Sequence, residues 1–414
     1  MCCKVSVVIP VYNVERYLGE CLESVFVQTL SDIEILCIDD NSTDESLSIL
    51  KQYQKSDNRI QIIELAQNKG LSYVRNVGME NSKGKYIYFL DSDDMIEKNA
   101  LEILFRRAER DRLDVIFFDA KIKYEDKEFI KKFETYVDVH RGKYEGIKSG
   151  MELFEEFVSN QEWTSSVPRQ FWSRQFLMTN DIRFYEGIIH EDELFTLVAL
   201  TLAERAEFIN ECLFIRRFRK GSIMTNVTSD RDFYGYFITY YLANKYICKN
   251  KLKRRAIDKH LAILYGKIVR AYEKLKEQYD LSEGFCDQEI KNAFYFFEST
   301  QNKHMAYGCF GSEAIEEIKK YRIVYVYGAG IIAGSVCESL ERNDIIVQSF
   351  IVSQLDRNPK IFKGRNVRAI DELDKEDKNI LVIIAVNMIY QEEVKALLEN
   401  KKVKYVTYNS LEVL

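Results

Sequence analysis

Residues 86–94 read YIYFLDSDD, a run of apolar and aromatic residues that ends in three aspartates and a serine. This pattern predicts a buried strand whose carboxyl end delivers polar side chains to one edge of a sheet. The same design recurs in VSVVIPVYN at 5–13 and in IEILCIDDNSTD at 33–44. We expect a strand in each of these segments, the first stopped by Pro10 and the second ending at Asp39.

Amphipathic stretches separate these strands. Val14 to Phe26 places apolar residues at helical spacing, and Asp40 to Asp44 offers side-chain oxygens that can cap a following helix. The alternation of strand and helix from Lys4 to Ala120 is typical of an α/β fold with a mostly parallel sheet. Further elements are expected as a helix up to about Lys55, a short strand over Ile60–Leu65 and a helix over Leu71–Met79.

The pattern of expected strands and helices changes after about residue 120. Mixed strand and helix patterns give way to tyrosine-rich helical periodicity, and a second α/β pattern follows, with a Gly328-Ala329-Gly330 turn between a strand and a helix. We therefore predict a first domain over 1–230 with halves at about 4–120 and 121–230, a helical bridge over 231–318 and a small α/β module over 319–414.

Composition and charge exclude several classes of protein. A chain of 414 residues is too long for a single small module. No uncharged apolar run approaches the roughly 20 residues that a membrane-spanning helix needs. A net charge of −6 gives no bulk attraction to nucleic acid, so we expect no nucleic-acid partner. The nine cysteines lack paired CxxC spacing, which favours reduced thiols over disulfides or a zinc site.

The N-terminus and one basic segment bear on location. Met1 to Lys4 leads directly into a strand-like run without the features of a secretory signal, so we expect a cytoplasmic protein. The basic cluster at 249–255 has two readings, a solvated helix face or a peripheral contact with the inner face of the cell membrane. The sequence leaves both readings open, and it leaves a homo-oligomer open as well.

Four motifs together resemble a known family. They are VSVVIPVYN at 5–13, ILCIDDNSTD at 35–44, NKGLSYVRNVG at 68–78 and YFLDSDD at 88–94. In this order and spacing they resemble the nucleotide-sugar-binding half of family 2 glycosyltransferases, of the bacterial polysaccharide type. The resemblance covers roughly residues 4–220. It implies an α/β GT-A nucleotide-sugar-binding domain with a mostly parallel sheet. The resemblance does not cover the tail, for which the sequence pattern predicts a helical middle segment and a small C-terminal Rossmann-like α/β domain.

Asp91 and Asp93 match the DxD motif of that family. Two carboxylates two residues apart at a strand terminus can converge on one divalent cation, which would neutralise the charge of a departing diphosphate. The resemblance implies Mn²⁺ or Mg²⁺ as cofactor, with Asp93 as direct ligand and Asp91 nearer the ribose or the metal-bound waters. The competing interpretation is a solvated acidic turn.

Four further residues match positions that bind the nucleotide in the family. The resemblance places Pro10 and Tyr12 against the uracil, the tyrosine ring as a stacking face. It makes Asp40 the acceptor for the N–H of the base. Arg75 matches a position that faces the nucleotide, the alternative being an arginine on the helix surface. Together these matches imply a UDP-linked donor.

The candidate catalytic base lies in the segment FYEGIIHEDELF at 184–195. The resemblance singles out Asp192 as base, with Glu191 beside it. His190 is a second candidate, because its ordinary pKa of about 6.5 lies closer to neutrality than that of an aspartate. Alternatively, acids in the first turn of a helix simply favour its dipole.

Two later segments complete the reading. The loop RRFRKGSIM at 216–224 resembles a basic element that folds over the diphosphate, which assigns Arg219 and Ser222 to donor binding, unless it is a solvated basic loop. The glycine turn at 328–330 matches part of a dinucleotide fingerprint, but the second strand of that unit ends without an acid. We expect a packing or partner module rather than a nucleotide site, similar to Rossmann-like modules appended to some bacterial glycosyltransferases.

These observations predict a metal-dependent inverting glycosyltransferase. It would transfer a sugar from a nucleotide donor, UDP-linked, to a glycan or lipid-linked glycan acceptor in surface polysaccharide biosynthesis. Two other hypotheses stay open at this point. One is a bifunctional protein whose C-terminal domain binds NAD or a nucleotide, and the other is a sugar-nucleotide-binding module without catalysis.

Overall fold

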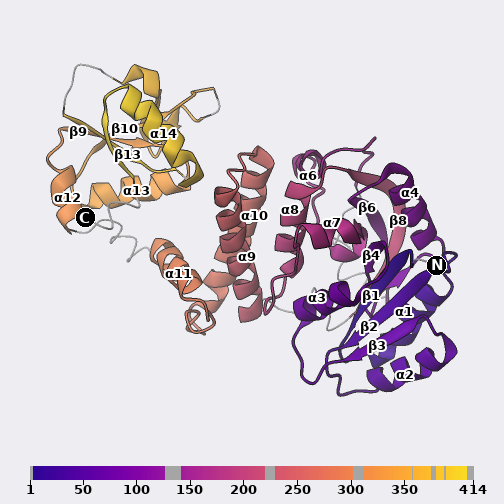
Figure 1. Ribbon diagram of the computed structural model, residues 1–414. Helices are drawn as coiled ribbons and strands as arrows, with labels where there is room; N and C mark the ends of the chain where they lie inside the picture. Colours follow the sequence, from indigo (N-terminus) through magenta and orange to yellow (C-terminus); the bar gives the residue numbers. More distant parts are fainter. Residues whose placement is uncertain are drawn as a thin grey trace. The chain divides into compact units, whose positions relative to one another are not determined.

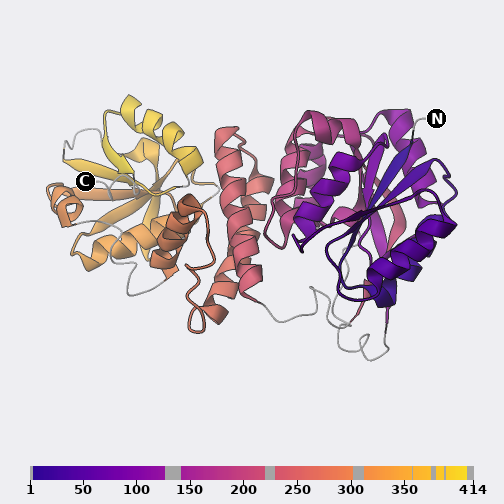
Figure 2. The ribbon, with the colours of Figure 1, turned by 60° about the horizontal axis from the view of Figure 1, so that its bottom comes forward.

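The computed structural model describes most of the chain. The described residues are 3–125, 141–219, 229–301, 312–356, 358–373, 379–386 and 388–407. The chain divides into two compact units (Figure 1 and Figure 2). The first unit contains residues 1–246 and 254–284, and the second contains residues 247–253 and 285–414.

A mixed eight-stranded sheet forms the first unit. Its strands are β1 (Val5–Val11), β2 (Ile33–Asp39), β3 (Ile60–Glu64), β4 (Tyr86–Phe89), β5 (Met95–Ile96), β6 (Val115–Tyr124), β7 (Gln170–Ser173) and β8 (Ala206–Phe218). Their order is β3-β2-β1-β4-β7-β6-β8-β5. The four strands β3, β2, β1 and β4 are parallel, whereas β7 is antiparallel to both of its neighbours. The predicted α/β class and the parallel N-terminal half are confirmed.

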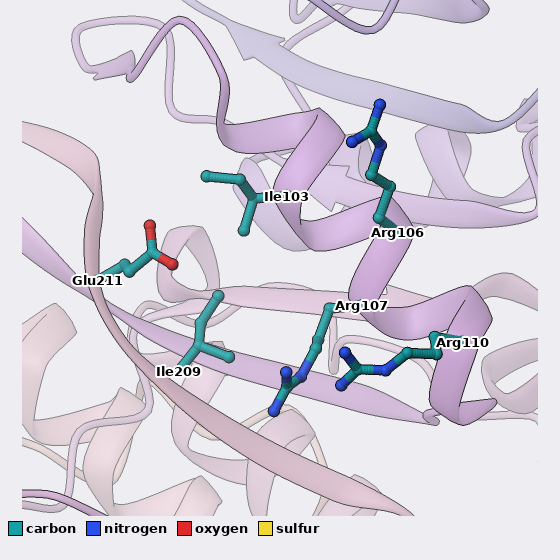
Figure 3. Close-up of a pocket in the computed structure, with 6 residues that line it drawn as sticks. All are labelled: Ile103, Arg106, Arg107, Arg110, Ile209 and Glu211. Carbon is teal, nitrogen blue, oxygen red and sulfur yellow. The ribbon is translucent and has the colours of Figure 1, made fainter.

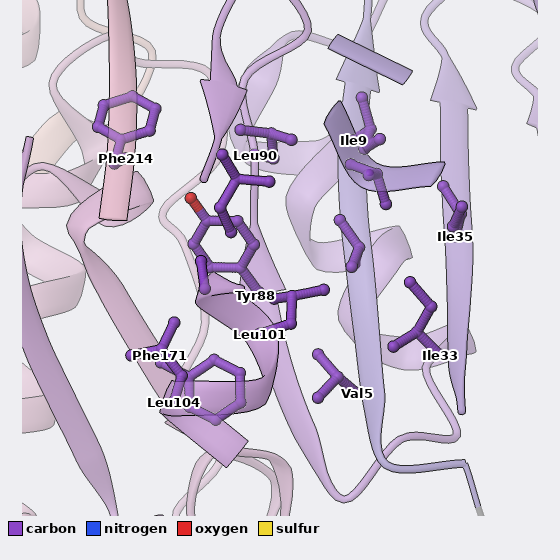
Figure 4. Packing of buried hydrophobic residues seen from close by; sticks show 14 of the residues in the cluster. Val5, Ile9, Ile33, Ile35, Tyr88, Leu90, Leu101, Leu104, Phe171 and Phe214 are labelled. Atoms are coloured by element: carbon purple, nitrogen blue, oxygen red, sulfur yellow. The ribbon is translucent and has the colours of Figure 1, made fainter. Parts of the chain in front are cut away.

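Helices cover both faces of this sheet. The helices that belong wholly or mostly to the first unit are α1 (Glu15–Phe26), α2 (Ser46–Ser56), α3 (Leu71–Asn81), α4 (Ala100–Asp111), α6 (Gly150–Ser159), α7 (Arg174–Thr179), α8 (Glu191–Leu202), α9 (Asp230–Lys249) and α10 (Arg255–Leu275), with a 3-10 turn η1 at Val167–Arg169. α1, α2 and α4 bury their apolar sides in one core with alternate residues of β1 and β2, among them Val5, Ile9, Ile33 and Ile35 (Figure 4). Period-two alternation in these strands therefore fixes which side chains form this core.

α3 lies against the opposite face of β1 and β2. A Cβ atom at Gly78 would lie 2.2 Å from Cγ1 of Val8, so only glycine permits this close approach of helix and sheet. The approach matters for function because α3 carries Arg75 and its neighbour Asn76 toward the edge where β1, β2 and β4 end.

One expectation about β1 is wrong. Pro10 does not stop the strand, which continues through Val11 in register with β2. Pairing with β4 ends at Val8, and Pro10 shares the β4-facing side of the strand with Val8 because hydrogen-bonding direction alternates along a strand. The missing N–H of Pro10 therefore interrupts no ladder.

The described residues between the two sheets form mainly helices, as expected. α9 and α10 belong for the most part to the first unit, where α10 packs against α6. Two more helices, α11 (Gln288–Gln301) and α12 (Ser312–Ile318), belong to the second unit. No helix within the described ranges is long and apolar enough to cross a membrane. The domain boundaries near 230 and 318 stay a prediction.

The second unit contains a smaller sheet. Its strands are β9 (Ile323–Tyr327), β10 (Val347–Val352), β11 (Ile361–Phe362), β12 (Arg365–Ala369), β13 (Ile380–Ile384) and β14 (Lys404–Thr407). They follow the order β11-β12-β10-β9-β13-β14, and all neighbours are parallel except β11 and β12. The connecting elements include α13 (Ile331–Arg342), the 3-10 turn η4 (Ile370–Glu372) and α14 (Met388–Asn400). The glycine turn joins β9 to α13, as the sequence predicts.

Candidate active site

The carboxyl ends of β1, β2 and β4 meet at one edge of the first sheet, where open α/β folds bind ligands. Tyr12 follows β1, Asp40 follows β2 and Asp91 follows β4. The side chain of Tyr12 is 47% exposed, whereas Pro10 is buried in the strand. The exposed ring is thus free to act as a stacking surface at this edge.

The loops after β1 and β2 brace one another. The N–H of Thr43 donates to Oδ1 of Asn13 over 2.8 Å, and the N–H of Glu15 donates to Oδ2 of Asp44 over 3.0 Å. Asn13 has a φ of 51°, in the left-handed region that asparagine tolerates better than most residues. These bonds fix the loop that presents Tyr12.

The buried carboxylate of Asp40 holds the start of α3. The backbone N–H groups of Lys69 and Gly70 donate to its two oxygens over 2.7 and 2.8 Å. Each carboxylate oxygen has more than one acceptor position, so a further donor can still be accepted. The sequence did not predict this link between the end of β2 and the loop before α3.

Arg75 joins two parts of the site. Its Nη2 donates to Oδ1 of Asp91 over 2.7 Å, and its Nη1 donates to Oε1 of Glu191 over 2.5 Å. The side chain is only 3% exposed, so the alternative of a surface arginine is wrong. Burial by itself would lower the pKa of Arg75, but Asp91 and Glu191 raise it, so the guanidinium stays charged. The arginine therefore links the loop at residues 91–94, here called the DxD loop, to the segment that carries the candidate base.

The neighbouring Asn76 strengthens the same connection. Its Nδ2 donates to the carbonyl of Phe184 and to Oε1 of Glu186, and its Oδ1 accepts from the N–H of Phe184. The sequence signal that could have identified Asn76 is its place beside Arg75 in the motif at 68–78. The Arg-Asn pair of α3 thus anchors both ends of the segment 184–191.

The three acids of the DxD loop differ in their partners. Asp93 accepts from Nε and Nη2 of Arg219 at 2.9 and 2.8 Å through its Oδ2, and Asp94 accepts from the N–H of Arg217 over 2.6 Å. Burial, then Asp91, raises the pKa of Asp93 against the effect of Arg219. Burial and both neighbouring acids raise the pKa of Asp94 well above its usual range. Asp94 is buried and fastens the loop to β8, so Asp91 and Asp93 are the carboxylates that face the site.

The loop after β4 can bind a divalent metal only together with ligands from outside the protein. Within the described part of the chain, no three side chains of His, Cys, Asp or Glu are grouped to hold a metal ion. Asp91 and Asp93 supply carboxylate oxygens, the ligand type that Mg²⁺ and Mn²⁺ prefer. Mg²⁺ is commonly bound by one or two carboxylates together with substrate phosphates and water. The donor set therefore suits a metal that arrives with a phosphorylated ligand.

The end of β8 and the next residue, Arg219, lie beside the DxD loop. The guanidinium groups of Arg219 and Arg217 stand over the ring of Tyr17, at 4.7 and 5.1 Å from its centre. Arg219 forms an ion pair with Asp93, and its assignment to donor binding stays a prediction. Ser222 lies outside the described residues.

Asp192 is the second residue of α8. Its half-buried carboxylate makes no hydrogen bond to any residue that the structure describes. Burial raises the pKa of Asp192, and Glu193 adds to the effect, whereas Arg75, His190 and Lys267 oppose it. The neighbouring Glu191 is bound to Arg75, and burial raises the pKa of Glu191 to about 7. Of these two acids, Asp192 is the one whose oxygens remain open to another molecule.

His190, the second candidate for the base, is engaged with α9. Its Nε2 lies 2.9 Å from Oδ1 of Asp232, and its ring stacks on Tyr236 with centres 4.1 Å apart. Asp232 and, on α10, Lys267 were not identified from the sequence. No sequence motif marks these two residues. They reach α8 only because α9 and α10 pack beside it.

A separate cavity of about 290 Å³ lies between α4 and β8 (Figure 3). It is near the start of β8, at the other end of this strand from Arg217. Each of its arginines has a carboxylate partner: Arg106 pairs with Glu102, Arg107 with Glu207 and Arg110 with Asp111. The cavity is therefore not an open anion site. Its lining residues are Ile103, Arg106, Arg107, Arg110, Ile209 and Glu211.

The family model and the similar proteins all indicate a glycosyltransferase family. Residues 6–171 match the model described as glycosyl transferase family 2. The chain is 34% identical over 222 residues to glycosyltransferase GlyA of Streptococcus pneumoniae serotype 4 (strain TIGR4), which covers 53% of this chain and 31% of that protein. It is 34% identical over 209 residues to the poly(ribitol-phosphate) beta-glucosyltransferase of Bacillus spizizenii (strain W23), 49% of this chain and 30% of that protein.

A third relative is covered over most of its length. Glycosyltransferase GlyG of the same S. pneumoniae strain is 30% identical over 232 residues, which are 53% of this chain and 72% of that protein. The chain thus spans less than a third of GlyA but most of GlyG. Together with the match at 6–171 and the α/β fold of the first unit, this similarity places the chain in glycosyl transferase family 2, with a glycosyltransferase domain of the GT-A fold.

Proposed function

We propose that this protein is a metal-dependent inverting glycosyltransferase with a UDP-linked sugar donor. The observation that carries the proposal is the double ion pair of Arg75, which joins Asp91 on the donor side to Glu191 on the side of the candidate base. A donor loop and a base segment held by one buried guanidinium form a single site. That arrangement suits a reaction between two substrates that meet there.

The donor would lie along the carboxyl edge of the sheet. Tyr12 offers its exposed ring to the base, and Asp40 accepts from the N–H of uracil. Asp93 and Asp91 would hold Mn²⁺ or Mg²⁺, which supplies positive charge to the diphosphate as it leaves. Arg219 is paired with Asp93 and can bind diphosphate oxygens beside it.

The acceptor would react on the side of α8. Its hydroxyl oxygen attacks the anomeric carbon, the bond from that carbon to the diphosphate oxygen breaks, and UDP carries away the bonding electrons. Asp192 accepts the hydroxyl proton. The open carboxylate and raised pKa of Asp192 support this role, because a base with a higher pKa takes up a proton more readily. His190 is a weaker candidate, since its Nε2 already faces Asp232.

The acceptor class is a glycan or lipid-linked glycan of the cell surface. Similarity to the poly(ribitol-phosphate) beta-glucosyltransferase supports an acceptor that belongs to a surface polymer. A cytoplasmic location, with peripheral contact at the inner face of the membrane, would suit such an acceptor.

The second unit would serve assembly or positioning as a Rossmann-like module. Its five parallel strands follow the order β12-β10-β9-β13-β14, the 3-2-1-4-5 order of dinucleotide-binding folds. However, β10 ends at Val352 and is followed by Ser353 and Gln354, so no acid stands where one would bind a ribose, and Asp356 comes later in the chain. The turn at Gly328 has a structural reason, since its φ is 116° and an added Cβ would lie 2.8 Å from the carbonyl oxygen of Ala385.

The test is nucleotide binding with and without metal. Titration of UDP into the full chain with MnCl₂ should give tighter binding than titration with a chelator present. Asp93→Ala should remove most of this difference. Asp181→Asn changes an exposed aspartate that is not among the proposed donor-binding residues, and asparagine tolerates its left-handed φ of 48°, so this variant serves as control. UDP binding by Asp93→Ala with undiminished dependence on Mn²⁺ would contradict the assignment.

A further inference from the structure

The segment that carries Asp192 is clamped from the side opposite to α3. From α9, Asp232 binds the ring of His190 and Tyr236 stacks on it. A Cβ atom at Gly235 would lie 2.2 Å from the carbonyl oxygen of Ile189, so the backbone of α9 directly adjoins the segment. α9 therefore reaches the residues immediately before α8.

α10 reaches the first turn of α8. Nζ of Lys267 donates to Oε1 of Glu193 over 3.0 Å, and it stands 4.8 Å from the ring centre of Tyr236. Nε2 of His260 lies 3.6 Å from the other oxygen of Glu193. One lysine thus contacts both α8 and α9, beside the candidate base.

The charge of Lys267 matters because its surroundings are buried and acidic. Burial would raise the pKa of Glu193, but Lys267 and His260 lower it, and Glu193 in turn raises the pKa of Lys267 against burial. Both members of the pair are therefore charged. The charged and titratable groups around Asp192 are Glu191 and Glu193 on its own helix, His190 before it, Arg75 from α3, Tyr236 from α9 and Lys267 from α10.

We propose that α9 and α10 complete the catalytic unit, and that Lys267 is a positioning residue that holds the base segment and keeps a positive charge beside Asp192. This inference rests on the proposed role of Asp192. It extends the active site to residues beyond the family match, which ends at residue 171. Arg75 holds the segment from the donor side, and Lys267 balances Glu193 on the other side.

The experiment uses the full chain and measures the pH profile of UDP release from UDP-GlcNAc and from UDP-glucose with MnCl₂. Lys267→Gln keeps a hydrogen-bond donor near Glu193 but removes the charge. We expect the acid limb of kcat to move upward by about one pH unit, because loss of a nearby cation makes Asp192 harder to ionise. Lys267→Arg should restore the limb, since it restores the charge.

Arg270→Gln is the matched control. It removes a positive charge one turn further along α10, at an exposed position. Its pH profile should equal that of the wild type, and UDP affinity should be unchanged in all three variants, since none contacts the donor edge. A Lys267→Gln protein with the wild-type acid limb and kcat would overturn the inference, and so would a shift of equal size in Arg270→Gln.

If Lys267→Gln does not fold, a second variant still tests the inference. Asp232→Asn, on α9, weakens the hold on His190 at a partly exposed position. It should lower kcat about tenfold or more with unchanged UDP affinity, and an unchanged kcat would overturn the inference. Asp192→Asn separates this result from the proposed function. Normal turnover in Asp192→Asn would contradict the proposed role of Asp192 as base. If Asp192→Asn loses turnover while the Lys267 and Asp232 variants behave as wild type, only the inference about α9 and α10 is overturned.

Discussion

At the scale of single residues, neighbouring acids have different tasks because their partners differ. Asp91 pairs with Arg75, Asp93 pairs with Arg219, and Asp94 accepts a backbone N–H. On α8, Glu191 is bound to Arg75 while Asp192 stays open. Sequence position alone therefore does not decide which carboxylate can meet a substrate.

Asp192→Asn should lower kcat by about 10²- to 10⁴-fold and leave UDP binding unchanged. The amide cannot accept the proton of the acceptor hydroxyl, and Asp192 does not contact the donor residues. Release of UDP and calorimetric UDP binding check the two halves of this prediction. Glu204→Gln, an exposed acid beyond the end of α8, is the control and should behave as wild type.

The raised pKa of Asp192 predicts the direction of the pH dependence. The base must be ionised to accept a proton. Since burial raises its pKa above the ordinary 3.8, activity should fall at a higher pH on acidification than for an exposed aspartate. Turnover should thus be full above the raised pKa and decline as the pH drops through it. A profile of kcat that stays flat down to pH 4 in a folded protein would count against Asp192.

Arg219→Gln should weaken UDP binding in the presence of Mn²⁺. Its guanidinium adjoins Asp93, where it can pair with the diphosphate, and a charge-assisted hydrogen bond contributes about 1.5–3 kcal/mol. Calorimetry should therefore show a Kd increased by roughly tenfold or more. Arg106→Gln, whose side chain lines the separate cavity near the start of β8, should bind UDP as the wild type does.

At the scale of elements, α3 connects fold and site. It packs on β1 and β2 through Gly78 and carries Arg75 and Asn76 to the segment before α8. Its position against the sheet therefore determines whether the donor loop and the base segment meet. A small change in this packing should affect stability and activity together.

Gly78→Ala should destabilise the first unit by about 1–3 kcal/mol, because the added methyl group would overlap with Val8. Gly266→Ala is a matched control within α10, where the nearest atom to the new Cβ is the flexible end of Arg270 at 3.4 Å. That change should be neutral or slightly stabilising, since alanine favours helix over glycine. Chemical denaturation of the two variants compares the effects directly. Equal stability of both would show that the contact of α3 with Val8 relaxes without cost.

At the scale of the whole molecule, the two units have different expected roles. The residues proposed for donor binding and catalysis lie in the first unit, as far as the structure describes them. The second unit has a mostly parallel sheet with the strand order of dinucleotide-binding folds, but no acid stands directly at the end of β10, since Asp356 comes later in the chain. We therefore expect no chemical contribution from it to sugar transfer.

Two measurements test this separation. NAD and NADP at millimolar concentration should not raise the melting temperature of the full chain, because a ligand stabilises only the protein that binds it. A chain that ends at Gly284, the last residue of the first unit, should still release UDP from its donor when circular dichroism shows it folded. A clear stabilisation by NAD would instead favour the bifunctional alternative.

The sequence by itself determined the α/β class, the strand over Ile33–Asp39, the start of α3 at Leu71 and the loop with Asp91 and Asp93. These features depend on local periodicity and turn residues, which act over a few positions along the chain. Pro10 was misjudged because its effect depends on where the neighbouring strand ends, which is not a local property.

Only the tertiary structure decided the connections across the site. Arg75 is separated from Glu191 by 116 residues, and His190 and Glu193 meet Asp232 and Lys267 through two helices that carry no motif. Such pairs form because buried charges need partners, and the partner can come from any segment that packing brings near. The sequence therefore supplied the residues with the chemistry, and the packing of α3, α9 and α10 around α8 determined which of them are held and which remains open.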